Sequence, residues 1–123
     1  MKAALLVALL GGALGTAQAR VIDIVWDPGR RFETTAALAP GQPLEVCGKL
    51  DKGQAVSWSF RSDAALDFNI HYHEAARVVF PTKRDANAGA SGTLVAPVRQ
   101  DYCWMWTNRS AVEATVTLTL QRP

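Results

Sequence analysis

The chain has 123 residues, of which 49% are hydrophobic and 20% are charged. This length allows one domain, and the apolar content excludes a disordered chain, because disordered segments lack the apolar surface that offsets chain entropy. The 13 Lys and Arg residues against 11 Asp and Glu residues give a net charge of +2. Such near-neutrality argues against a nucleic-acid binder, since these proteins neutralise several phosphates with a basic face.

Residues 1–19 have the pattern of a secretory signal peptide. Lys2 supplies the positive end, residues 3–14 form an apolar run, and Ala17-Gln18-Ala19 fits the small-x-small cleavage site. We predict cleavage between Ala19 and Arg20 and a single mature domain over residues 20–123, located in the periplasm or secreted. The apolar run is too short for a membrane span, which needs about 20 residues.

Cysteine usage agrees with an exported protein. The mature chain holds only Cys47 and Cys103, and an even pair in an oxidising compartment favours one disulfide. The two positions are 56 apart (103 minus 47), and closing a loop of that size stabilises a fold by about 4 kcal/mol in the loop-entropy description. The spacing is not that of a CxxC redox pair, and a two-thiolate metal site would need both cysteines reduced where the compartment oxidises them.

Apolar and polar residues alternate in short runs along the mature chain, which is typical of strands rather than helices. The predicted strands are Val21–Trp26, Arg31–Thr35, Leu44–Leu50, Ala55–Arg61, Leu66–His73, Arg77–Phe80, Gly92–Ala96, Tyr102–Thr107 and a closing run from Val112. Turns are expected at Asp27-Pro28-Gly29, Pro40–Pro43, Asp51-Lys52-Gly53, Ser62-Asp63 and Asn108-Arg109-Ser110. Residues 81–91 are expected to form an exposed loop or a sheet crossover. We therefore predict an all-β fold, an antiparallel β-sandwich of about seven to nine strands with one disulfide.

The alternation also assigns faces to the strands. Residues expected to point inward are Leu66, Phe68, Ile70 and Tyr72, and in the closing strand Val112, Ala114, Val116, Leu118 and Leu120. Residues expected to point outward in the former strand are Asp67, Asn69, His71 and His73. Between Tyr102 and Trp106, the aromatic residues share one face, and Cys103 and Met105 share the other.

Several of these elements together resemble the GOLD (Golgi dynamics) domain, a β-sandwich of secretory-pathway cargo adaptors and some lipid-carrier proteins. The resemblance covers residues 44–121 and is carried by Cys47, Asp51-Lys52-Gly53, Trp58-Ser59-Phe60, Leu66–Ile70, Tyr102-Cys103, Trp106-Thr107-Asn108 and the closing Val/Thr strand. It implies a disulfide between Cys47 and Cys103, as in the adaptor branch, and a binding or interaction module. The coiled-coil and transmembrane segments of the adaptors are missing, so a trafficking role is not implied.

His71-Tyr72-His73-Glu74 is the segment with metal-ligand character. Residues i and i+2 of a strand share a face, so the two imidazoles can converge on one Cu(II) or Zn(II) ion. Glu74 can add a carboxylate or orient an imidazole, and the sulfur of Met105 is a soft ligand for copper. The structural alternatives are a solvated outer sheet face for the histidines and a strand buried on both sides for Met105.

Catalytic patterns are not visible in this sequence. No nucleophile has an evident base and acid, no carboxylate pair has an apolar setting, and no glycine-rich phosphate loop occurs. We expect a non-enzymatic module without a cofactor that binds an unknown protein or small ligand, with no nucleic acid and no membrane span. The alternative is a periplasmic copper or zinc binding protein that uses His71 and His73. Oligomeric state is not indicated by the sequence.

Overall fold

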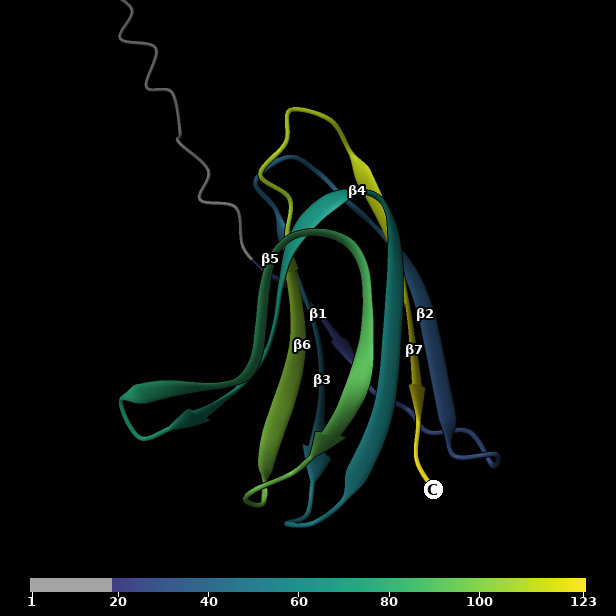
Figure 1. The fold of residues 1–123 in the computed structure, drawn as a ribbon, viewed down its shortest axis with the longest axis vertical. Coiled ribbons are helices and arrows are strands. Elements are labelled where there is room, and N and C mark those ends of the chain that lie inside the picture. Colours follow the sequence, from purple (N-terminus) through teal and green to yellow (C-terminus); the bar gives the residue numbers. More distant parts are fainter. Residues whose placement is uncertain (1–18) are drawn as a thin grey trace, which may run out of the picture.

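The computed structural model describes residues 19–123 (Figure 1). The predicted signal peptide lies outside the described residues, apart from Ala19. Seven strands follow one another: β1 (Arg20–Asp23), β2 (Arg31–Leu38), β3 (Pro43–Leu50), β4 (Ala55–Glu74), β5 (Arg77–Val95), β6 (Gln100–Thr107) and β7 (Ala114–Gln121). Residues 19–123 contain no helix, and so none that is long and apolar enough to cross a membrane. The predicted all-β class and strand number are confirmed.

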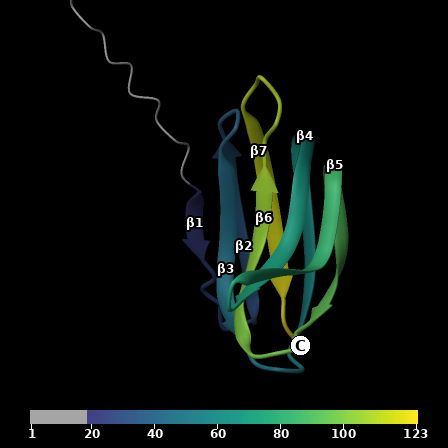
Figure 2. The ribbon, with the colours of Figure 1, turned by 90° about the vertical axis from the view of Figure 1, so that its left-hand side faces the viewer.

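The long strand β4 joins the two layers of the sandwich. Its first half, Ser57–Ser62, pairs with β7, and its second half, Asp67–His71, pairs with β6. The strand order β1-β3-β6-β4-β7-β2 therefore bends at β4 into one layer with β1, β3 and β6 and another with β7 and β2 (Figures 1 and 2). Strand β5 pairs with β4 through both layers, so the β4–β5 hairpin forms one edge of the molecule.

The predicted turn at Ser62-Asp63 is wrong, because both residues lie inside β4. The two predicted strands Ala55–Arg61 and Leu66–His73 are one strand, and its register with β5 shifts between Arg61 and Leu66. Such a bulge bends a strand while pairing continues on either side. Turn-forming residues therefore mark the place where β4 passes from one layer to the other.

The predicted loop over residues 81–91 is also wrong, since this segment belongs to β5. Most of β5 is exposed to solvent, and an edge strand that is uncovered on both faces needs no alternating apolar residues.

Two smaller corrections concern the first and last strands of the fold. The sheet was predicted to be antiparallel, but β1 pairs in parallel with β3. The closing strand was predicted to begin at Val112 with its side chain inward, but Val112 is exposed and the strand begins at Ala114.

Aromatic side chains fill the space between the layers. Tyr102, Trp104 and Trp106 of β6 are fully buried, as their alternation predicts. The Trp106 ring lies 5.4 Å from that of Phe68 and 5.6 Å from that of Phe60, measured between centroids. Because these residues occupy the inner face of β6, Cys103 and Met105 lie on its outer face, where the candidate site is found.

Candidate functional site

A groove of about 800 Å³ lies on the outer face of β3, β6 and the second half of β4. Residues 72–85, here called the hairpin arm, extend from the sandwich and cross in front of β6 and β3 (Figure 2). The residues that line the groove are Glu45, Asp67, Phe68, Asn69, His71, His73, Val78, Phe80, Lys83, Asp85, Met105, Thr107 and Arg109. The arm thus converts a sheet face into a concave surface within the size range of ligand sites, about 300–1,000 Å³.

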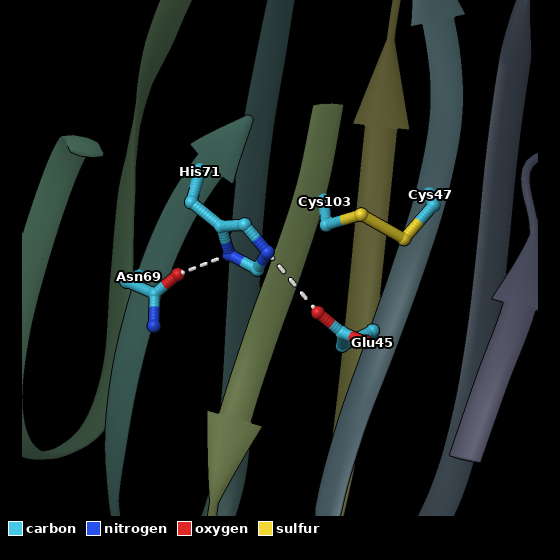
Figure 3. Close-up of a disulfide and its surroundings, with 5 residues drawn as sticks. All are labelled: Glu45, Cys47, Asn69, His71 and Cys103. Atoms are coloured by element: carbon cyan, nitrogen blue, oxygen red, sulfur yellow. Dashed lines mark hydrogen bonds and ion pairs between the residues drawn. A yellow bond between two sulfur atoms is a disulfide. The ribbon is translucent and has the colours of Figure 1, made fainter. Parts of the chain in front are cut away.

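His71 lies at the inner end of this groove and is only 4% exposed. Its Nδ1 atom lies 2.7 Å from Oδ1 of Asn69, and its Nε2 atom lies 3.1 Å from Oε1 of Glu45 (Figure 3). Burial lowers the pKa of His71 below its ordinary value, more strongly than the nearby Glu45 carboxylate raises it. Burial therefore favours the neutral form of the ring, which sits between two oxygen atoms. The expectation of a solvated face is wrong for this residue, because the hairpin arm covers it.

The predicted disulfide is confirmed, and it lies beside His71. It joins Cys47 of β3 to Cys103 of β6, which are direct partners in the strand register. Ligand atoms of Glu45, His71 and Cys103 all lie within 4.8 Å of one another. A second hollow, of about 520 Å³, opens on the disulfide and is lined by Asp23, Ile24, Cys47, Gly48, Lys49, Asp101 and Cys103. The bond is half-buried, and this hollow gives solvent access to it.

Charged groups occupy the other end of the groove. The Asp67 carboxylate accepts hydrogen bonds from Nε of Arg109 and from the backbone N–H of Ala86, and these contacts, Arg109 foremost, lower the pKa of Asp67. Nζ of Lys83 lies 5.6 Å from the centroid of the Phe80 ring. The groove consequently offers carboxylates, cations and an aromatic face to whatever binds there.

The predicted metal ligands do not all meet. His71, His73 and Met105 line the same groove, and the two imidazole centroids are 5.3 Å apart. Glu74 lies outside it, next to the hairpin turn, with its carboxylate 3.9 Å from the Arg77 guanidinium. The carboxylate beside His71 comes from Glu45.

Sequence reasoning did not find Glu45, although a signal was present. Once Cys47 and Cys103 are paired across antiparallel strands, the residue two positions before Cys47 must face the residue two positions after Cys103. The structure shows this pairing between Glu45 and Met105. The disulfide could therefore have placed Glu45 on the same outer face as Met105.

The sequence matches no family model and no curated protein. Solved structures resemble the fold. PliG of Aeromonas hydrophila, a periplasmic inhibitor of g-type lysozyme, superposes with a TM-score of 0.69 at 10% identity, over 86% of this chain and 98% of that chain. PliG of Salmonella Typhimurium gives 0.62 at 13% identity, over 85% and 98%. The pre-peptidase C-terminal domain of a Bacillus anthracis collagenase gives 0.60 at 11% identity, over 87% and 98%. At these identities the likeness is one of fold.

Proposed function

We propose that this protein is an exported, non-enzymatic module that binds a protein partner in the groove beneath the hairpin arm. One observation carries the proposal: the arm holds Val78 and Phe80, which are 42% and 47% exposed, above a polar and charged floor. Exposed aromatic and aliphatic side chains beside paired charges are typical of protein interfaces. The groove is also where the side chains of three strands and the arm converge.

Export is supported by the leader pattern of residues 1–19 and by the disulfide. Two of the structural neighbours are periplasmic and inhibit g-type lysozyme, so a g-type lysozyme is the first partner to test. The relationship to GOLD domains stays a prediction that rests on the residue pattern given above.

The chemistry of the groove favours binding over catalysis. His71 contacts Asn69 and Glu45, and among residues 19–123 neither histidine hydrogen-bonds to a serine hydroxyl. Both cysteines are held in the disulfide, which removes them as nucleophiles. An imidazole without a hydroxyl or thiol partner has no nucleophile to activate as a general base.

The test is binding of residues 20–123 to a g-type lysozyme by calorimetry, together with an assay of lysozyme inhibition. We expect Phe80→Asp to weaken binding at least about tenfold, since it places a charge on a central apolar contact. Val112→Asp is the matched control, because Val112 is 64% exposed and does not line the groove. Equal loss of affinity in both variants would contradict the groove as the binding site. Absence of binding by the wild type would remove lysozyme as the partner.

A second candidate function is copper or zinc binding by His71 and His73 with Met105. It is favoured by the shared groove and by the short distance between the two rings. Native mass spectrometry of the oxidised chain with Cu(I), Cu(II) and Zn(II) tests it. One equivalent that is bound by the wild type and lost in His73→Ala would support this function, whereas equal weak binding by both would contradict it.

A further inference from the structure

We infer that the Cys47–Cys103 disulfide masks a zinc site: after a dithiol reduces the bond, the two thiolates, the His71 imidazole and the Glu45 carboxylate bind one Zn(II) ion. This inference goes beyond protein binding: the site shares Glu45 and His71 with the groove, and it uses Glu45 and the cysteines in place of His73 and Met105.

The ligands stand in a short row across three neighbouring strands. In the strand register Cys47 is opposite Cys103, and Cys103 is opposite His71, while Glu45 lies two residues before Cys47 on the same face (Figure 3). Ligand atoms of Glu45, His71 and Cys103 lie within 4.8 Å of one another. Ligand atoms around a tetrahedral zinc, at about 2.0–2.3 Å from the metal, are separated by about 3.3–3.8 Å. Shifts of about 1 Å, within the reach of side-chain rotation, therefore bring these three ligand atoms to tetrahedral distances. After reduction the Cys47 thiolate, opposite Cys103 in the register, must rotate toward the same point to complete the set.

The imidazole is already oriented for a metal. The Nδ1 atom of His71 lies 2.7 Å from Oδ1 of Asn69, and in the tautomer that carries its proton on Nδ1 the Nε2 lone pair is directed at Glu45 and the disulfide. An oxygen acceptor behind the ring is the usual companion of a zinc-bound histidine. The Nε2 atom of His71 lies 3.1 Å from Oε1 of Glu45, so both atoms can contact one cation placed between them.

The donor set selects the ion. Two thiolates, one imidazole and one carboxylate in a tetrahedral arrangement suit Zn(II), whereas sites made of oxygen alone suit magnesium or calcium. In the oxidised protein both sulfur atoms are bonded to each other and are poor ligands. Reduction therefore changes the site from one imidazole and one carboxylate to a full set of four.

The bond is open to a reductant. Both cysteines are half-buried, and the 520 Å³ hollow beside Asp23 and Lys49 leads to them. One thiolate of the dithiol attacks a cysteine sulfur to give a mixed disulfide, and its second thiol releases the protein thiol, so that two electrons pass to the protein and the dithiol becomes a disulfide. Binding of Zn(II) then displaces the two thiol protons.

The fold is expected to persist without the bond. Strands β3 and β6 keep eight register pairs, and the inner faces of both strands pack into the core through Val46 and Trp104. The cysteine side chains lie on the opposite face and contribute none of that core. Reduction consequently frees the ligands without removing the strands that hold them.

The test uses residues 20–123 reduced with a phosphine, which does not compete for the metal as a thiol does, and titrated with Co(II) and then Zn(II). We expect one equivalent of Co(II) with a thiolate charge-transfer band and tetrahedral visible bands, both abolished by Zn(II). Glu45→Gln and His71→Ala should each weaken Zn(II) binding at least about tenfold. Cys47→Ser/Cys103→Ser and the oxidised wild type should show no charge-transfer band, and His73→Ala should bind as the wild type does.

Three results would overturn the inference. The first is a reduced chain that stays folded by circular dichroism and binds no more Zn(II) than the oxidised chain. The second is unaltered affinity in Glu45→Gln, which keeps the shape of the side chain and provides the test if His71→Ala does not fold. The third is a reduced chain that is unfolded both with and without Zn(II). Loss of metal binding in His73→Ala would instead assign the metal to the second candidate site described above.

Discussion

Asn108 and His71 are the two buried polar side chains within residues 19–123, and their surroundings differ. Nδ2 of Asn108 donates hydrogen bonds to the carbonyls of Leu38 and Val112, at 3.1 and 2.8 Å. Its Oδ1 accepts from the backbone N–H and the hydroxyl of Ser110, at 3.0 and 2.7 Å. Each polar atom of Asn108 therefore has partners of the opposite kind, which makes it a structural residue that ties the end of β2 to residues 108–112.

The partners of His71 are two side chains that line the groove. Its ring nitrogens lie beside Oδ1 of Asn69 and Oε1 of Glu45, and their donor and acceptor roles depend on the tautomer. The difference teaches how to separate structural from functional burial in this molecule. The partners of Asn108 lie away from the groove and indicate a residue that holds the fold, whereas the partners of His71 line the groove beside the disulfide, where the ring can bind a proton or a metal ion.

Among the substitutions that test this comparison, removal of the disulfide should change the free energy of unfolding most. We expect Cys47→Ala/Cys103→Ala to lower the free energy of unfolding by about 4 kcal/mol, because the unfolded chain regains the freedom of a loop of this length. Guanidinium unfolding of the wild type and the variant measures it. The contacts of Asn108 should remain intact, and a loss below about 1 kcal/mol would show that the bond does not restrict the unfolded chain as assumed.

Asn108→Ala should have the next largest effect, a loss of about 3 kcal/mol in the free energy of unfolding. The substitution removes the side-chain donor to the Leu38 carbonyl and the acceptor of the Ser110 backbone N–H, whereas the Val112 carbonyl keeps the Ser110 hydroxyl as a donor. The same denaturation experiment applies. Asn87→Ala is the matched control, since Asn87 makes a single hydrogen bond, to the carbonyl of Asp85, on the exposed hairpin. Equal effects of both substitutions would contradict the structural role of Asn108.

The third largest effect should be a change in the free energy of unfolding with pH that depends on His71. Because burial lowers the pKa of His71 in the folded protein, the unfolded chain binds the proton more readily. Stability from the neutral ring is complete above the unfolded pKa, about 6.5, and decreases as the pH falls below it. We expect the free energy of unfolding to decrease from about pH 7.5 to 5, a window that lies above most carboxylate titrations. His71→Gln should flatten this dependence, and an unchanged slope in the variant would assign it to another group.

Arg109→Ala should give the smallest effect on stability. The side chain of Arg109 is 77% exposed, so loss of its ion pair with Asp67 should change the free energy of unfolding by less than about 0.5 kcal/mol. The pKa of Asp67 should nevertheless rise toward its ordinary value, because the guanidinium lowers it in the wild type. Carboxyl NMR titration tests this expectation. An unchanged Asp67 pKa would show that the hydrogen bond from the backbone N–H of Ala86 alone is sufficient to lower the pKa of Asp67.

The inward and outward faces of β6 and of the second half of β4 were predictable because side-chain alternation is a local property of a strand. Tyr102, Trp104 and Trp106 are buried as expected, while Cys103 and Met105 lie on the other face. The extent of β5 was not predictable in this way. Its residues 81–91 hold no large apolar side chain and are mostly exposed, and a segment without apolar alternation also describes a loop.

The amino-acid sequence by itself determined the all-β class, the aromatic core faces and the single cysteine pair, since these depend on local alternation and on composition. Only the tertiary structure decided that β3 lies beside β6, that Glu45 reaches His71, and that the hairpin arm covers that ring. These features depend on which strands pair and in what register over long distances along the chain. Local alternation is the same for every choice of partner strand, so it places His71 on a face but cannot show what lies opposite.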